Sequence, residues 1–182
     1  MLQAQSNEGT SMVWLSSFQL SRVNSPDDSS EKMSPRVRVR VTYAGRLDKD
    51  SEGLILLTND GDLIQALMKG SNHHEKEYVV KVDKEITPAF LEKMASGVYL
   101  KELDQTTRPC HIEQVGKLTF KIVLTQGLNR QIRRMTKELG YNVTGLKRIR
   151  IEKITIDGLK IGQYRELTER EKENLYETVG LK

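Results

Sequence analysis

The sequence has a single cysteine, Cys110, among its 182 residues, which excludes a disulfide framework and a cysteine-rich metal site. No apolar run approaches the roughly 20 residues of a membrane helix. The first residues also lack the basic and apolar segments of a secretory signal. These absences predict a cytoplasmic protein without a membrane partner.

Recognisable metal and phosphate motifs are missing as well. His73 and His74 are adjacent, so their side chains do not converge on one ion, and no ligand set at suitable spacing accompanies them. Gly45, Gly53 and Gly61 are not part of a phosphate-cradling loop that leads into a helix. We therefore expect no metal and no cofactor.

The composition is that of a domain with a core and a large polar surface, since 37% of residues are hydrophobic and 30% are charged. The net charge of +4 is modest, but its distribution is uneven. Residues 121–153 contain nine Lys or Arg and two acids, Glu138 and Glu152. Such a basic segment suits a polyanion such as RNA, although a solvated surface can have the same composition.

The periodicity predicts an α+β fold with a mostly antiparallel sheet and flanking helices. Residues 1–35 contain nine serines and few aliphatic residues, which predicts a disordered leader outside the core. Strands are expected at 36–41, 53–58, 77–82, 109–115, 118–125 and 147–156. Helices are expected from about 63 to Gly70, from Thr87-Pro88 to Gly97, from an Asn129 cap to Gly140, and after the capping box Thr168–Glu171.

The segment GRLDKDSEGLILLTNDG places five charged residues directly before an apolar strand. Asp48 lies among them, at the entrance to a core strand, where the behaviour of a carboxylate depends on its partners. Ordinary solvated charges at a strand entry are the alternative interpretation. The segment alone does not decide between them.

A second segment, NRQIRRMTKEL, predicts a helix with an apolar face and a cationic face. Ile132, Met135, Thr136 and Leu139 recur at helical spacing and should face the core. The remaining surface carries Arg130, Arg133, Arg134 and Lys137, whose mutual repulsion is a few tenths of a kcal/mol per pair. An RNA phosphate or a buried carboxylate would relieve that repulsion.

Together with EKEYVV between them, these segments resemble the RsuA family of pseudouridine synthases over about residues 43–180. The resemblance implies a mostly antiparallel central sheet with a cleft across its middle. It also implies isomerisation of a uridine in RNA, most simply 23S ribosomal RNA with transfer RNA as the second candidate, by a monomer without a cofactor. Asp48 would be the catalytic carboxylate, Arg133 would pair with it, and Tyr78 would stack on the uracil, although a tyrosine on a half-buried strand is more often part of a core. Phosphate contacts would come from Arg46, Lys49, Arg130, Arg134, Lys147, Arg148 and Arg150.

The chain departs from the family pattern before residue 43. The resemblance predicts a catalytic domain over residues 36–182, whereas the family's S4-type RNA-binding domain and its Lys-Pro-x-Gly segment are not found in residues 1–43. An RNA-binding remnant that has lost turnover therefore stays open as an alternative function.

Overall fold

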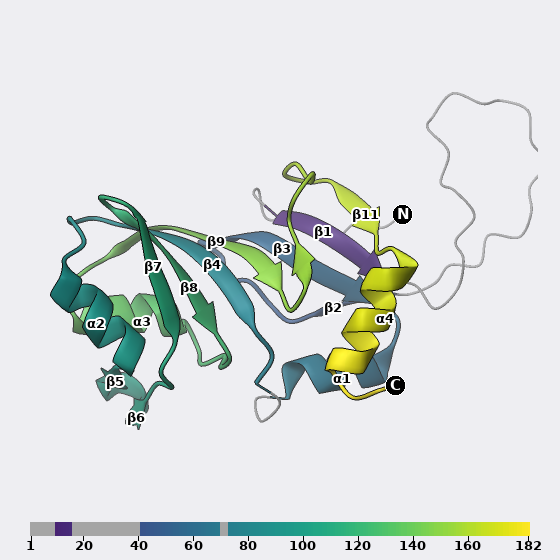
Figure 1. The fold of residues 1–182 in the computed structure, drawn as a ribbon, viewed down its shortest axis with the longest axis horizontal. Coiled ribbons are helices and arrows are strands. Elements are labelled where there is room, and N and C mark those ends of the chain that lie inside the picture. The colour runs from purple at the N-terminus through teal and green to yellow at the C-terminus, as the bar shows by residue number, and fades with distance from the viewer. Residues whose placement is uncertain (1–9, 16–40, 70–72) are drawn as a thin grey trace, which may run out of the picture.

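The structure, a computed structural model, describes residues 10–15, 41–69 and 73–182. These ranges form one large sheet, one two-stranded sheet and helices around them (Figure 1). The strands are β1 Thr10–Leu15, β2 Thr42–Ala44, β3 Glu52–Thr58, β4 Lys76–Val82, β5 Tyr99–Leu100, β6 Gln105–Thr106, β7 His111–Gly116, β8 Thr119–Leu124, β9 Val143–Ile151, β10 Ile154–Thr155 and β11 Tyr164–Glu166. The helices are α1 Gly61–Met68, α2 Pro88–Ser96, the short 3-10 helix η2 Lys101–Leu103, α3 Gln131–Glu138 and α4 Glu169–Thr178.

The large sheet has the strand order β11-β1-β3-β9-β4-β8-β7, and β2 and β10 pair beside this path with β3 and β9. Its ladders β4–β8, β4–β9, β7–β8, β2–β3 and β9–β10 are antiparallel. The ladders that β3 forms with β1 and β9 are parallel, as is the ladder between β1 and β11. The prediction of an α+β fold with a mostly antiparallel sheet is confirmed. No helix in the described ranges is long and apolar enough to cross a membrane.

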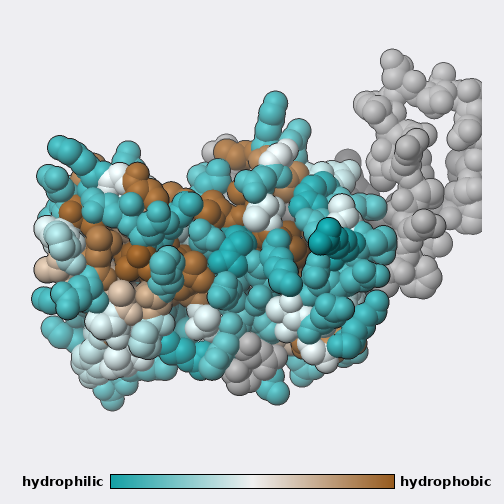
Figure 2. Space-filling view, viewed as in Figure 1, coloured by the Kyte–Doolittle hydropathy of each residue, from teal (hydrophilic) through white to brown (hydrophobic). Residues whose placement is uncertain are grey.

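Two hydrophobic cores lie on this sheet, one in each half of the molecule (Figure 1). The first is built from β4, β8, β9, α2 and α3, and includes the fully buried Phe120, Ile122 and Met135. The second lies between β3, α1 and α4. Brown, apolar surface is visible mainly over the half that contains α2, whereas the surface around α4 is predominantly hydrophilic (Figure 2). The long strands β4 and β9 connect the two cores. The position of a polar site on the sheet between the cores is therefore fixed by hydrophobic packing in both halves.

Signals that act over a few residues are confirmed. Thr87 caps α2 by accepting a hydrogen bond from Phe90 N at 3.2 Å, and Pro88 is the first helical residue. Thr168 and Glu171 form the predicted capping box of α4. Local capping chemistry is sufficient to fix these helix starts.

Two expectations about strands need correction. Residues Thr10–Leu15, within the predicted leader 1–35, form β1 and pair with β3 and β11. The rest of the leader and residues 36–40 of the strand predicted at 36–41 lie outside the described residues. The single strand predicted at 147–156 is two strands, because Glu152 has a φ of 49° and turns the chain back on itself as β10.

The start of α3 also differs from the prediction. Arg130, in the left-handed conformation, occupies the cap position, and no side chain caps the helix. The backbone oxygen and Oδ1 of Asn129 accept hydrogen bonds from the Arg134 guanidinium, at 2.9 and 3.2 Å. Asn129 therefore accepts hydrogen bonds from Arg134, one turn into the helix, instead of capping the first turn of α3.

Candidate active site

The loop between β2 and β3 carries Asp48. Ser51 N donates a hydrogen bond of 2.9 Å to the Asp48 carbonyl, which closes a tight turn directly before β3. The Asp48 side chain is half-buried, whereas Lys49 and Asp50 beside it are exposed. The expectation that Asp48 lies at the entrance to a core strand is confirmed, since Leu54 of β3 is completely buried.

Gly53 fixes the point at which this loop enters the sheet. A Cβ atom at Gly53 would lie 2.2 Å from the Arg148 carbonyl oxygen, and φ at this residue is +118°. Only glycine tolerates both the positive φ and so close an approach of two backbones. The contact lies within the short parallel ladder that joins β3 to β9, in which Glu52 pairs with Lys147 and Gly53 with Arg148.

Arg148 holds both ends of the loop. Its Nε donates to the Leu54 carbonyl at 2.7 Å, and its Nη1 donates to the Arg46 carbonyl at 3.3 Å. The residue is only 2% exposed. Its guanidinium therefore lies inside the protein, bound to main-chain oxygens, and not on the surface where the predicted contact with an RNA phosphate would be made.

Arg133 reaches the middle of the same loop from α3. Its Nη2 donates to the Asp50 carbonyl at 2.6 Å and lies 3.5 Å from Ser51 Oγ, and its Nη1 donates to the Val143 carbonyl at 3.3 Å. The predicted ion pair between Arg133 and Asp48 is not formed within 4.0 Å. The guanidinium binds the backbone two residues beyond Asp48, so it holds the loop and leaves the carboxylate free of this partner.

Tyr78 lies on β4, directly opposite Arg148 on β9. Side chains directly opposite each other on neighbouring strands share a face and lie about 5 Å apart at Cβ. The same face carries Val80 and Leu146 of the first core, and Tyr78 packs against that core. Arg148 thus lies between the strand of Tyr78 and the loop of Asp48, and it brings the two predicted catalytic elements to one region.

Sequence reasoning missed Lys76, which lies two residues before Tyr78 on the same face of β4. Lys76 Nζ is 3.4 Å from the His74 carbonyl. Burial and then the nearby Arg148 guanidinium hold the pKa of Lys76 below its ordinary value, while the Glu152 carboxylate acts in the opposite sense. Its place in the K-x-Y pattern of EKEYVV was the available signal.

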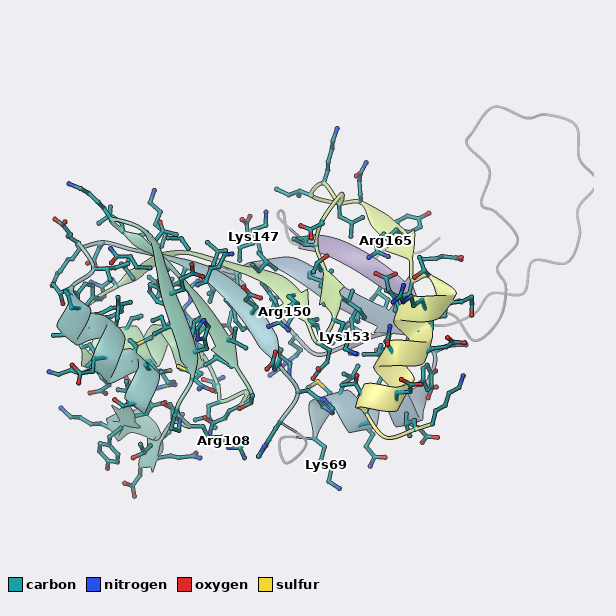
Figure 3. The ribbon with its side chains drawn as sticks, viewed as in Figure 1. Lys69, Arg108, Lys147, Arg150, Lys153 and Arg165 are labelled. Carbon is teal, nitrogen blue, oxygen red and sulfur yellow. The ribbon has the colours of Figure 1, made fainter. Side chains whose placement is uncertain are left out.

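A register shift separates Arg150 from Arg148. Arg150 pairs with Glu77 and Arg148 with Tyr78, which leaves Ile149 as an extra residue on β9. Glu77 and Val79 face the side of β4 opposite Tyr78, because successive residues on a strand alternate between faces. Their partners Arg150 and Lys147 therefore share the face of the sheet opposite Arg148. Figure 3 labels both residues along β9.

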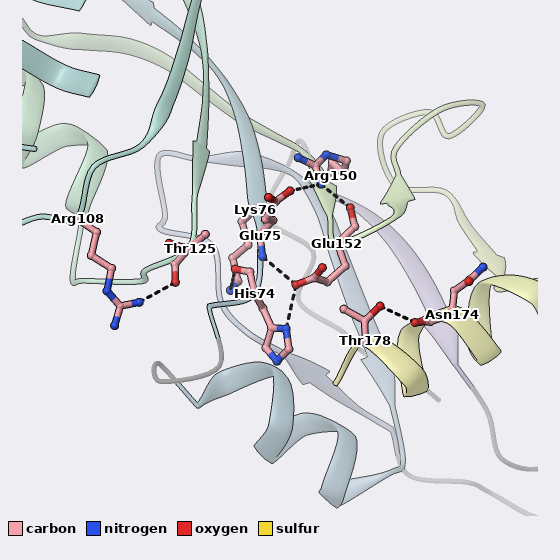
Figure 4. Close-up of polar contacts among 9 residues, drawn as sticks. All are labelled: His74, Glu75, Lys76, Arg108, Thr125, Arg150, Glu152, Asn174 and Thr178. Carbon is pink, nitrogen blue, oxygen red and sulfur yellow. Dashed lines mark hydrogen bonds and ion pairs between the residues drawn. The ribbon is translucent and has the colours of Figure 1, made fainter. Parts of the chain in front are cut away.

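Several arginines predicted to bind RNA phosphates already pair with carboxylates of the protein. Arg150 Nε lies 2.7 Å from Glu77 Oε2. Its Nη1 lies 3.0 Å from Glu75 Oε2 and donates to the Glu152 carbonyl (Figure 4). Arg134 pairs with Glu102, and Arg130 lies 3.6 Å from Asp50. The anion expected to relieve the repulsion between these cations is, for these two arginines, a carboxylate of the protein, although Asp50 and Glu102 are exposed and not buried.

The other predicted phosphate contacts differ in their exposure. Arg46 and Lys49 are exposed on the loop, and Lys147 is half-buried on β9. Exposed cations beside a candidate catalytic carboxylate are suitably placed for the phosphates of a bound nucleotide.

His74, considered above as a metal ligand, is buried against a carboxylate. Its Nδ1 lies 2.9 Å from Glu152 Oε1, which also accepts a hydrogen bond from Glu75 N at 2.8 Å (Figure 4). Within the part of the chain that the structure describes, no group of three or more His, Cys, Asp or Glu side chains could hold a metal ion.

A cavity of about 200 Å³ lies elsewhere, between the β9–β10 turn and α4. None of the loop residues 45–54, Tyr78 or Arg133 lines it. Its lining is mixed in charge, with Glu152 and Glu171 beside Lys153 and Arg170. We therefore place the candidate active site at the loop, where the polar side chains converge, and not in this cavity.

Comparisons with known proteins agree with the resemblance in sequence. A family model described as RNA pseudouridylate synthase matches residues 17–138. The dual-specificity RNA pseudouridine synthase RluF of Escherichia coli K12 is 46% identical over 140 residues, which are 77% of this chain and 48% of the relative. The ribosomal large subunit pseudouridine synthase B of Pseudomonas aeruginosa is 36% identical over 155 residues, 81% of this chain and 40% of that protein.

Among solved structures, a crystal structure of a pseudouridylate synthase superposes with a TM-score of 0.72 at 32% identity. The match covers 74% of this chain and 59% of that one. The chain spans about half the length of the curated relatives it matches.

Proposed function

Since this chain belongs to the RNA pseudouridylate synthase family, we propose that it isomerises a uridine in RNA to pseudouridine, with Asp48 as the catalytic carboxylate. The observation that carries the proposal is the fixed loop at the boundary between the two cores. Arg133 and Arg148 bind this loop through its backbone carbonyls and leave the Asp48 carboxylate to the substrate.

The reaction needs a carboxylate and no redox or phosphoryl chemistry. The bond between N1 and C1′ of uridine breaks, the uracil rotates and C5 bonds to C1′. The proton on C5 leaves to solvent and N1 takes up a proton from solvent, so the product is an isomer of the substrate. Asp48 can act as the nucleophile at C1′, as the nucleophile at C6, or as a base at the sugar. Each role requires the ionised carboxylate.

Arg133 and Tyr78 have supporting roles in this proposal. Arg133 positions Asp48 through the Asp50 carbonyl and not through a direct ion pair, so its planar guanidinium fixes the loop geometry. Tyr78 lies on the same face as Arg148 and would stack on the uracil. The target nucleotide must leave its helix or loop to reach these groups.

RNA would bind across the exposed loop and its surroundings. We propose that Arg46, Lys49 and Lys147 contact phosphates, and that Arg130 and Arg134 do so only by exchanging Asp50 and Glu102 for phosphate. We assign the substrate to large-subunit ribosomal RNA, with transfer RNA as the second candidate, because the relatives' names include a large-subunit enzyme and a dual-specificity one. We propose that the catalytic unit comprises residues 36–182 together with β1, which pairs with β3 in the same sheet.

The decisive assay is tritium release from RNA that contains [5-³H]uridine. The full chain would be incubated with large-subunit ribosomal RNA and with transfer RNA from cells that lack the corresponding modification. Tritium release that reaches one equivalent per RNA molecule supports the proposal, and mapping the modified nucleotide identifies the substrate. RNA binding without release would favour the RNA-binding remnant, and the absence of both would contradict either function.

A further inference from the structure

We infer that Arg148 is a positioning residue for the reaction: it fixes both ends of the loop that carries Asp48 and sets this loop against the strand of Tyr78. The inference rests on the proposed function, and it adds a residue that the reaction chemistry does not itself require. Arg148 would touch neither the RNA nor the reacting atoms.

The hydrogen bonds of Arg148 are the first argument. One guanidinium reaches the Arg46 carbonyl before Asp48 and the Leu54 carbonyl after it, at 3.3 and 2.7 Å. A planar fork with several donors can make both bonds at once, whereas the single ammonium of a lysine cannot reproduce that geometry. The loop between these two carbonyls is therefore fixed at both ends by one guanidinium.

Burial is the second argument. Arg148 is 2% exposed, and its Nη2 is buried without a hydrogen-bond partner in the described part of the chain. A buried cation with an unsatisfied donor is a poor way to gain stability, because an apolar side chain of similar volume often serves as well or better. The arrangement is better explained by the placement of the loop than by the stability of the core.

The rigidity of the backbone is the third argument. The Arg148 main chain closely approaches Gly53: a Cβ atom added to Gly53 would lie within 3.0 Å of three backbone atoms of Arg148. Arg148 is also paired with Tyr78 across β4 and β9. The main chain of Arg148 is therefore fixed in the sheet, and the hydrogen bonds of its guanidinium fix the loop relative to the sheet.

The test compares the full-length variants Arg148→Lys and Arg148→Met with Arg165→Lys as a matched control. Arg165 also makes a two-pronged contact, to Glu171, but it lies on β11 and does not bind the loop. Three quantities are measured for each protein: kcat and KM for tritium release, the Kd for RNA, and hydrogen exchange of the amides of residues 46–54 without RNA.

Both Arg148 variants should lower kcat by at least thirtyfold while KM and the Kd for RNA change by less than threefold. Amides of the loop should exchange at least tenfold faster, while amides of β4 and β8 keep their protection. Arg165→Lys should change none of these quantities beyond twofold. At least one of the two variants should stay folded, because both side chains keep much of the volume, lysine keeps the charge, and methionine removes the buried charge.

Two results would overturn the inference. Unchanged loop exchange in Arg148→Lys would mean that the guanidinium does not position the loop. Faster exchange with an unchanged kcat would mean that positioning by Arg148 does not serve catalysis. If the wild-type chain releases no tritium, the proposed function fails separately, and hydrogen exchange still shows whether Arg148 holds the loop.

Discussion

Replacing Gly53 with alanine should destabilise the protein strongly, because the β3 backbone closely approaches the β9 backbone at this glycine. The new Cβ would lie 2.2 Å from the Arg148 carbonyl oxygen and 2.6 Å from its backbone nitrogen, and φ is +118°. Placing a non-glycine residue in a positive-φ conformation costs about 1–2 kcal/mol, and overpacking typically adds about 1–3 kcal/mol. We therefore expect Gly53→Ala to lower the free energy of unfolding by about 2–5 kcal/mol.

The control is Gly61→Ala at the first residue of α1. A Cβ atom there would have no neighbour within 4 Å, and φ is not positive. This variant should be neutral or stabilising by up to about 1 kcal/mol, because alanine reduces the entropy of the unfolded chain. Urea denaturation followed by circular dichroism measures both. A Gly53→Ala protein within about 0.5 kcal/mol of wild type would refute the close approach of β3 to β9.

Two further predictions concern charged side chains. Hydrogen bonds from Arg165 lower the pKa of the Glu171 carboxyl to about 2, so its stabilising effect is present above the ordinary pKa near 4.5 and is lost as the pH falls from there towards 2. After allowance for solvent screening, Glu171→Gln should lower the free energy of unfolding at pH 7 by about 1–2 kcal/mol. Urea denaturation between pH 7 and 2.5 should show the difference between wild type and variant narrowing below pH 4.5. A pH-independent difference would contradict the stabilising role of the Arg165–Glu171 contact. Arg133→Lys should reduce kcat at least tenfold because it loses the two-pronged contact with Asp50 and Val143, whereas Arg130→Lys should change kcat less than threefold. Equal effects in single-turnover tritium release would show that Arg133 has no special role.

Features set by neighbouring residues could be predicted from the sequence. The strand β3 follows from its run of aliphatic residues, and the starts of α2 and α4 follow from Thr87-Pro88 and Thr168–Glu171. The family resemblance, carried by two long motifs, is confirmed by the family match over residues 17–138. The roles of Asp48, Tyr78 and Arg133 stay predictions.

Features set by contacts between distant residues could not be predicted. The basic segment and the family resemblance suggested that Lys147, Arg148 and Arg150 all contact RNA, but Arg148 lies inside, and the extra residue Ile149 places Arg150 on the opposite face. Nothing local marks Arg148 as the residue that meets Arg46 and Leu54. The partners of a long cationic side chain depend on which carbonyls the fold brings within reach, and this information is not present in a short segment.

The same argument applies to the acidic partners of the arginines. Glu75 and Glu77 lie far from Arg150 in sequence, and Glu102 lies far from Arg134. The basic segment is therefore less cationic in the fold than its composition suggests. Exposed loop cations such as Arg46 and Lys49 become the more direct candidates for RNA contact.

The most direct test of the central claim is tritium release by Asp48→Asn beside Asp50→Asn. Both substitutions remove one carboxylate from the same loop, and both keep the backbone carbonyls that Arg133 and Arg148 bind. We predict that Asp48→Asn lowers kcat by more than about 10⁴-fold, a barrier increase of roughly 5.5 kcal/mol, with RNA affinity and melting temperature close to wild type. Asp50→Asn should stay within about threefold of wild-type kcat. An Asp48→Asn protein that keeps turnover within about tenfold of wild type would contradict the assignment of Asp48 as the catalytic carboxylate.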